Sequence, residues 1–286
     1  VYLMSNAKLS ELLSLIEDPY VIRLVTNTLI QALASTVPSV VIALPISYFL
    51  ATYSFRGSGV IRNLLLTPFF SPAFAVTEGM IILLGDKGLV NQLSALLFGA
   101  HAPVFSILYS MQAVILAHIF YYLPLAVLML EQGFSRIDQD LIDAAHVAGA
   151  GWFKTFKAVY LNQLLPFVAA SSLLIFAFSF ITYSTPILIG GKFTTLEVEI
   201  YATRTRPISA SLAILQLFLT TLLAIAVLSA REKFYFRGQA GRRIRRTSGP
   251  LSSGILGKLL LAYSISLTFL ELLPIYLILA QALSPN

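Results

Sequence analysis

Long apolar stretches, separated by short polar segments, make up most of this chain. A helix needs about 20 apolar residues to cross the ~30 Å of hydrocarbon in a bilayer. The stretches do not alternate with a period of two, which favours helices over barrel strands. We therefore predict an all-α polytopic membrane bundle with about six transmembrane helices, at Val25–Tyr53, Leu64–Leu84, Ile107–Leu130, Leu164–Ile189, Leu212–Ala230 and Ile255–Ala282.

The composition agrees with this pattern. Charged residues make up 11% of the chain, whereas soluble domains contain about a quarter. The net charge of +6 fits basic cytoplasmic loops better than nucleic-acid binding, so we expect membrane lipid and no nucleic acid as a partner. The sequence has no cysteine, which excludes disulfides and thiolate metal ligands.

Lysine and arginine predict the orientation. If the first span runs from outside to inside, the inner segments contain thirteen of these residues and the outer segments contain six. The segments 86–103 and 190–208 then become outer loops. Within the second of these loops, four residues form a charged face that either contacts an external protein or is simply solvated: Glu197, Glu199, Arg204 and Arg206.

We predict four regions along the chain. Residues 1–22 form an amphipathic segment that lies on the outer membrane surface or packs on neighbouring helices. Residues 23–232 form a transmembrane core that contains a cytoplasmic loop at 131–163. Residues 233–254 are a basic, glycine-containing cytoplasmic linker. Residues 255–286 form another outward span, which is either the first helix of a second unit or an additional terminal helix, and the start at Val1 suggests a fragment.

The inner loop 131–163 is too long and too patterned for a simple turn. Ser135 to Asp138 resembles a capping box, which predicts a helix that starts near Ser135. Gly149 and Gly151 allow the chain to turn, and a second helix follows from about Trp152. Two faces result: a small one for a partner, from Leu141, Ala144, Ala145 and Ala148, and a bulky one for anchoring, from Phe153, Phe156, Val159 and Tyr160.

This loop resembles the "EAA" loop of permease subunits in binding-protein-dependent ABC importers. The likeness rests on Asp143-Ala144-Ala145, on Gly149 six residues after Asp143, and on Val159-Tyr160-Leu161. Asp143 replaces the usual glutamate, and Asn162 stands where the family has proline. The resemblance implies that this loop couples the protein to an ATPase, through Asp143, Ala144, Ala145, Gly149, Gly151 and Leu161.

Further stretches resemble the same family. Asn27-Thr28-Leu29 and Pro45-Ile46-Ser47-Tyr48 are similar to the start of its core. Gly190-Gly191 and the stretch Thr195–Tyr201 resemble the outer loop of ferric-iron and thiamine-type permeases, which are often fused double permeases. The resemblance thus implies the fold of a type I ABC importer permease, and it fits a second permease half after the linker.

The resemblance also implies the partners and the location. Cytoplasmic ABC ATPase subunits bind the ATP, an extracytoplasmic solute-binding protein delivers the cargo, and a second permease half completes the path. The chain itself is then no enzyme, needs no cofactor, and lies in a prokaryotic plasma (inner) membrane. Ferric iron or a thiamine-like solute is the expected cargo, although permeases for polyamine and phosphate share the loop.

Few residues point to other chemistry. The chain has no phosphate-binding G-x-x-x-x-G-K-[ST] motif, and its three histidines lack metal-site spacing. Intramembrane carboxylates are functional candidates, so Glu78 joins Tyr121 and Tyr122 as a candidate for the substrate pathway, whereas Glu271 suits structural pairing. The competing hypotheses are an ion-coupled secondary transporter, a membrane enzyme and a membrane scaffold.

Overall fold

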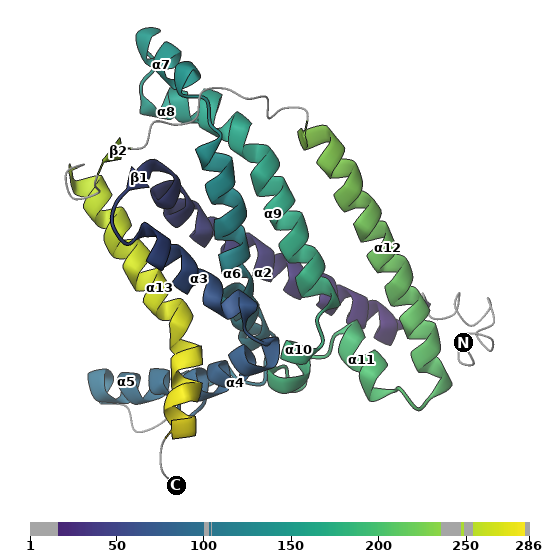
Figure 1. Cartoon of the computed structure of the whole chain (residues 1–286). Helices are drawn as coiled ribbons and strands as arrows, with labels where there is room; N and C mark the ends of the chain where they lie inside the picture. Colours follow the sequence, from purple (N-terminus) through teal and green to yellow (C-terminus); the bar gives the residue numbers. More distant parts are fainter. Residues whose placement is uncertain (1–16, 100–102, 104, 236–246, 249–253, 284–286) are drawn as a thin grey trace.

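The computed structural model is a bundle of long helices with shorter helices at both ends (Figure 1). It describes residues 17–99, 103, 105–235, 247–248 and 254–283. The predicted amphipathic segment therefore lies mostly outside the described residues, as does most of the predicted linker. In the described part, six helical stretches are long and apolar enough to cross a membrane.

Three helices form the centre of the bundle: α2 (Pro19–Thr52), α6 (Met111–Ser135) and α9 (Leu161–Ile181). Each packs against the other two, and their apolar side chains supply most of the main hydrophobic core. The helix α12 (Pro207–Tyr235) packs on α9. On the other side, α13 (Gly254–Leu283) packs against α2 and α3 (Ser58–Phe70). The predicted all-α membrane bundle is thus confirmed.

The predicted second span, 64–84, is not a continuous helix. The helix α3 ends at Phe70, Ser71 is extended, and α4 (Ala73–Leu84) begins after Pro72, which has no N–H to continue a helix. The helix α5 (Leu89–Phe98) follows within what we expected to be an outer loop. In Figure 1, α4 and α5 lie across the lower end of the bundle.

A glycine allows α4 to contact α13 closely. A Cβ atom on Gly79 would lie 2.3 Å from the carbonyl oxygen of Pro274, so no larger residue fits without a shift of the helices. The predicted fourth span, 164–189, is displaced: the helical stretch runs over Phe153–Ile181 and so begins and ends earlier than expected. Helix α9 ends at Ile181, and the separate helices α10 (Ser184–Ile189) and α11 (Leu196–Ala202) follow.

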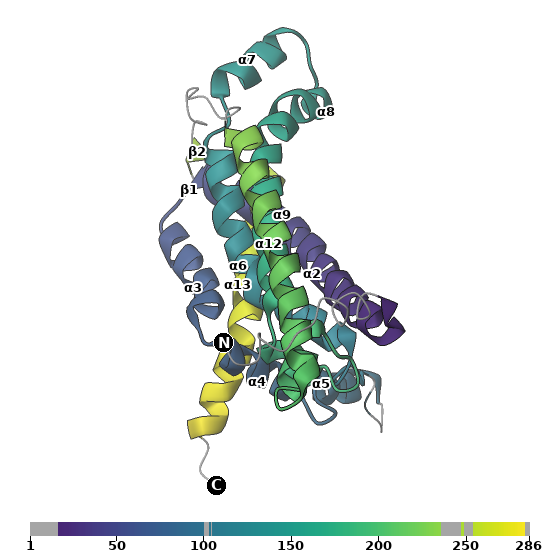
Figure 2. The same cartoon turned by 90° about the vertical axis from the view of Figure 1, so that its right-hand side faces the viewer.

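The short elements separate into two ends. One end carries α7 (Gln139–Val147), α8 (Trp152–Thr155) and a two-residue parallel pairing of β1 (Tyr53–Ser54) with β2 (Thr247–Ser248). The opposite end carries α4, α5, α10 and α11 (Figures 1 and 2). The loop 131–163 and residues 190–208 thus lie at opposite ends, as the predicted alternation requires. That the first of these ends is cytoplasmic stays a prediction.

Candidate functional site

The helix α7 projects beyond the ends of the long helices (Figures 1 and 2). It begins at Gln139, and its N-cap is Asp138, whose Oδ1 accepts a hydrogen bond of 3.0 Å from the backbone N–H of Asp140. The predicted cap, Ser135, is instead the last residue of α6, where its hydroxyl donates to the carbonyl of Glu131. An aspartate cap stabilises a helix start as well as serine does.

The C-terminal end of α7 is a Schellman turn, in which two backbone N–H groups close back onto the last turn. Gly149 N–H donates to the carbonyl of His146, and Ala150 N–H donates to that of Ala145, both at 2.9 Å. Gly149 has a φ of +74°, in the left-handed region that favours glycine. Gly151 has no such φ, so the turn predicted for two glycines is made by Gly149.

One side chain of α7 is buried against the rest of the protein. Ile142 is 5% exposed, and Ala145 lies partly buried against the same core. The outward face is apolar but solvent-exposed: Leu141 is 50% exposed and Val147 is 90% exposed, and Ala144 lies on the same side. The predicted small face is therefore divided, because Ala145 faces the core while Leu141, Ala144 and Ala148 face outward.

The chain returns to the bundle through α8 and a π-helical turn at Phe156–Tyr160, which leads directly into α9. Such turns occur often at functional sites. Val159 is buried and Tyr160 packs on the core, as expected for anchoring residues. Phe153 is not an anchor, since 70% of it is exposed, and Leu161 is 44% exposed at the start of α9.

Polar contacts fix both ends of the loop to the bundle. The amide side chain of Gln163, on α9, accepts a hydrogen bond of 3.0 Å from the backbone N–H of Asp138. Near the end of α6, Glu131 forms a two-pronged ion pair with Arg62 of α3; the Nε–Oε2 distance is 2.9 Å, and Nη2 bonds Oε1. These contacts tie the two ends of α7's supporting segment to α3, α6 and α9.

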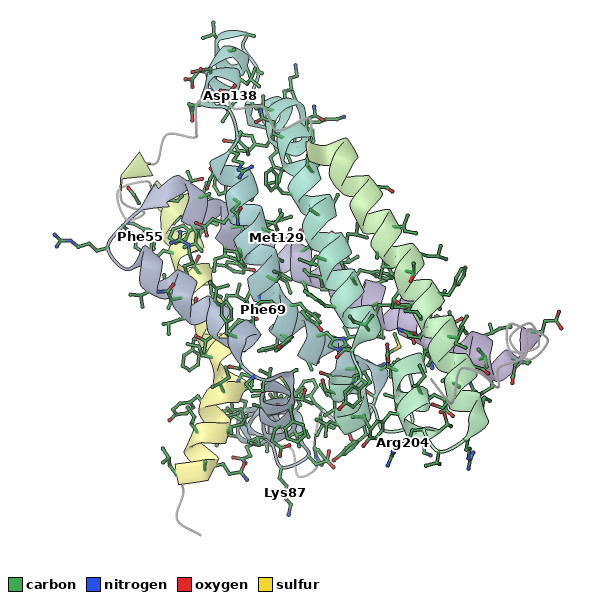
Figure 3. All side chains as sticks on the ribbon, turned by 45° about the vertical axis from the view of Figure 1, so that its right-hand side comes forward. Phe55, Phe69, Lys87, Met129, Asp138 and Arg204 are labelled. Atoms are coloured by element: carbon green, nitrogen blue, oxygen red, sulfur yellow. The ribbon has the colours of Figure 1, made fainter. Side chains whose placement is uncertain are left out.

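At the opposite end, the two stretches that resemble the family's core and outer loop contact each other. The side chain of Asn27 donates to the carbonyl of Thr194 at 3.0 Å, and the hydroxyl of Thr28 accepts from the N–H of Leu196 at 2.9 Å. The outer loop is thus attached to the first turns of α2. Figure 3 shows Arg204 at this end, far from Asp138.

The predicted charged face at 197–206 is not uniformly exposed. Glu197 accepts a hydrogen bond of 2.7 Å from Gln216 of α12, and Glu199 accepts one of 2.7 Å from the hydroxyl of Tyr20. Partial burial raises the pKa of the Glu197 carboxyl, while the hydrogen bond from Gln216 opposes that change. The two carboxylates thus join α11 to α12 and to α2, whereas Arg204 and Arg206 are exposed.

The candidate pathway residues are not all brought together. Glu78 lies on the exposed side of α4. Tyr121 donates a hydrogen bond of 3.2 Å to the carbonyl of Ser71, at the break between α3 and α4. Tyr122 is 5% exposed and stacks on Phe178 of α9, which makes it a packing residue in this conformation.

The described residues include no group of three or more histidine, aspartate or glutamate side chains placed to hold a metal ion. The arrangement suits a mechanical contact with a partner, because α7 is an exposed helix with mostly small side chains and is anchored to the bundle by the buried Ile142. Sequence reasoning missed Ile142, Gln163 and the pair Arg62–Glu131. The large apolar side chain of Ile142, beside Asp140 and Asp143, was a usable signal, but the contacts of the other three residues join distant segments.

Comparisons with known proteins agree on one family. The family described as "Binding-protein-dependent transport system inner membrane component" matches residues 21–233. The thiamine transport system permease protein ThiP of Brucella suis is 32% identical over 190 residues, which are 64% of this chain and 34% of that protein. A putative ferric transport system permease protein of Haemophilus influenzae is 23% identical over 191 residues, 67% of this chain and 30% of that protein.

Two further matches differ in coverage. The spermidine/putrescine transport system permease protein PotB of Escherichia coli is 27% identical over 158 residues, 55% of this chain and 57% of that protein. A chain of a bacterial alginate ABC transporter, solved with its periplasmic protein, has a TM-score of 0.62 at 15% identity and covers 83% of this chain and 86% of its own. The chain spans about a third of the length of the thiamine and ferric relatives.

Proposed function

This chain belongs to the family of binding-protein-dependent transport system inner membrane components, and we propose that it forms one permease half of an ATP-driven importer. The proposal rests on α7, which projects from the bundle, exposes an apolar face and is anchored through a buried side chain on its other face. That helix contains Asp143, Ala144 and Ala145, and Gly149 forms the turn that ends it. Gly151 and Leu161 lie where the chain returns to the bundle.

In this mechanism the chain converts movement of a partner into movement of its own helices. Cytoplasmic ATPase subunits bind α7, and ATP binding draws them together. Because Gln163 and Ile142 tie α7 to the bundle, the displacement passes to α6 and α9. The energy comes from preferential nucleotide binding to one conformation of the whole transporter.

The path itself needs a second permease half. We propose that α13, on the far side of the linker, begins that half, because it follows the family match at 21–233 and crosses the bundle as a separate long helix. A fused arrangement accords with the much greater length of the thiamine and ferric relatives. A solute-binding protein then delivers the cargo at the end that carries α11.

For the cargo, we propose a thiamine-like solute. The 32% identity to the thiamine permease exceeds the 23% and 27% found for the ferric and polyamine permeases. Ferric iron is the second candidate, since the match to the ferric permease covers a similar part of this chain. Glu78, Tyr121 and Tyr122 stay proposals for the pathway.

Reconstitution tests this function. The transporter that contains this chain is placed in liposomes with its ATPase and binding protein, and uptake of labelled thiamine is measured with ATP inside. We expect uptake that requires ATP and persists when ion gradients are collapsed. Uptake that follows the proton or sodium gradient without ATP would instead indicate a secondary transporter. Uptake of labelled ferric iron under the same conditions, without uptake of labelled thiamine, would replace the proposed cargo.

A further inference from the structure

The helix α2 turns a polar side toward the centre of the bundle. Gln31 and Ser35 are both fully buried there, one turn apart, against α6 and α9. The side chain of Gln31 crosses to α9, where its Nε2 donates to the carbonyl of Ser179 at 2.6 Å. Buried polar groups in a membrane bundle need partners, because lipid offers none.

A histidine of α6 faces the same point. His118 is 1% exposed, and its Nδ1 lies 3.4 Å from the hydroxyl of Ser35. Its ring contacts Tyr122, and Tyr122 stacks on Phe178, the neighbour of Ser179, with ring centres 6.0 Å apart. Residues Gln31, Ser35, His118 and Ser179 therefore form one cluster, which we term the α2–α6–α9 junction.

The hydrogen-bond distances at this junction indicate which ring nitrogen of a neutral His118 carries the proton. The hydroxyl of Ser35 donates its one hydrogen to the carbonyl of Gln31 at 2.7 Å, which is shorter than its 3.4 Å contact with His118, so it accepts from His118. The proton of the neutral imidazole is then on Nδ1, and Nε2 is an acceptor.

Three buried polar atoms of the junction have no hydrogen-bond partner among the described residues: Gln31 Oε1, His118 Nε2 and Ser179 Oγ. Two of them can only accept, and the third has a single hydrogen to donate. With the proton of His118 on Nδ1, one of the two acceptors therefore lacks a donor among these three atoms. Leaving such a group unpaired inside a protein is costly, so native structures rarely do so.

We propose that the α2–α6–α9 junction is a binding site for one internal water molecule. Water donates two hydrogen bonds, to Gln31 Oε1 and to His118 Nε2, and accepts one from the hydroxyl of Ser179. Three polar partners are typical of a buried water. A monovalent cation fits less well, because the hydrogen bonds of the junction include no carboxylate to balance its charge.

Direct observation is the first test. A crystallographic or cryomicroscopy map of the transporter that resolves ordered waters should show one density feature within hydrogen-bond distance of all three atoms. A map with ordered waters elsewhere but direct contact among these side chains would overturn the proposal. Thermal stability that depends on which of sodium, potassium or choline is present would also overturn it, in favour of a cation.

A double-mutant cycle is the second test. We expect Ser179→Ala and His118→Phe each to lower the Tm of the transporter by about 2–4 °C, the shift typical of one lost hydrogen bond. Combined, they should lower it by less than the sum, because both act through the same water. Ser47→Ala, a buried hydroxyl elsewhere on α2, is the control and should add fully to His118→Phe. A rise in Tm for His118→Phe, or full additivity with Ser179→Ala, would contradict the water.

Discussion

At the residue scale, Gly149 is the position at which the candidate site depends most on one amino acid. Nothing lies within 4 Å of a Cβ built there, so space is not the constraint. The constraint is the φ of +74°, which costs an L-residue about 1–2 kcal/mol. A glycine here fixes the direction in which α7 points, since the Schellman turn cannot close otherwise without strain.

The first prediction compares the two glycines of this turn. Gly149→Ala should lower the uptake rate clearly, because the strained turn reorients α7, while the amount of protein in the membrane stays the same. Gly151→Ala is the matched control: it adds the same methyl group in open space without a left-handed φ, and uptake should be near normal. Equal uptake for both variants, measured in membrane vesicles, would contradict the role given to Gly149.

The second prediction concerns pH at the outer end. Because burial raises the folded-state pKa of Glu197, its contribution to stability is fully present below the pKa of an unfolded glutamate, about 4.3. That contribution is lost as pH rises through the folded-state pKa. Glu197→Gln should therefore flatten the decline of Tm with rising pH, and near pH 7 it should not destabilise the protein.

Melting curves that start at about pH 4, near the pKa of an unfolded glutamate, and extend to about pH 8 provide the measurement. Glu199→Gln is a useful comparison, because that carboxylate lies on the same short helix and accepts a hydrogen bond from Tyr20. A Glu197→Gln variant with the same pH slope as the unaltered protein would show that the Glu197 carboxyl does not govern this dependence.

At the scale of elements, the ion pair between Arg62 and Glu131 joins α3 to the end of α6 from which the coupling loop departs. The side chains are 30% and 10% exposed, so the pair is only partly shielded. Breaking a fully buried pair costs about 3–5 kcal/mol, and here we expect about 2 kcal/mol, since water still reaches Arg62.

The third prediction follows from that pair. Arg62→Ala should lower the Tm and raise ATP hydrolysis in the absence of the binding protein, because α3 no longer restrains α6. The exchange Arg62→Glu with Glu131→Arg should reverse much of both effects. If the exchanged protein behaves no better than Arg62→Ala, the two charges do not act as a pair.

The sequence predicts which segments are helical far better than it predicts where each helix begins and ends. Apolar length sufficed for α2, α6, α12 and α13, but the second expected span breaks at Ser71-Pro72 and the fourth ends at Ile181. A proline in the sequence does not by itself predict the end of a helix, because α2 continues through Pro38 and Pro45. Which proline interrupts a helix depends on neighbours, such as Tyr121 at the carbonyl of Ser71, that local sequence does not reveal.

At the scale of the whole molecule, the predicted order of spans puts the loop 131–163 and the loop 190–208 on opposite sides, and the structure places them at opposite ends. The count of positive charges adds that the end with the loop 131–163 is cytoplasmic, which stays a prediction. Contacts between distant segments could not be predicted. Asn27 and Thr194 are 167 positions apart, and their hydrogen bond follows from the packing of α2 beside α11.

The central claim is that α7 lies in the cytoplasm and binds an ATPase. The chain contains no cysteine, so Val147→Cys, at a site 90% exposed, introduces a single reactive thiol into it. Thr205→Cys, exposed at the other end, is the matched control.

Labelling and cross-linking of these two variants test the claim most directly. In intact cells, a membrane-impermeant maleimide should label the Thr205→Cys variant and leave the Val147→Cys variant unlabelled. In the assembled transporter, a short cross-linker should join the thiol of the Val147→Cys variant to the ATPase subunit. Labelling of that thiol from outside, or no cross-link to the ATPase at any step of its cycle, would contradict the account.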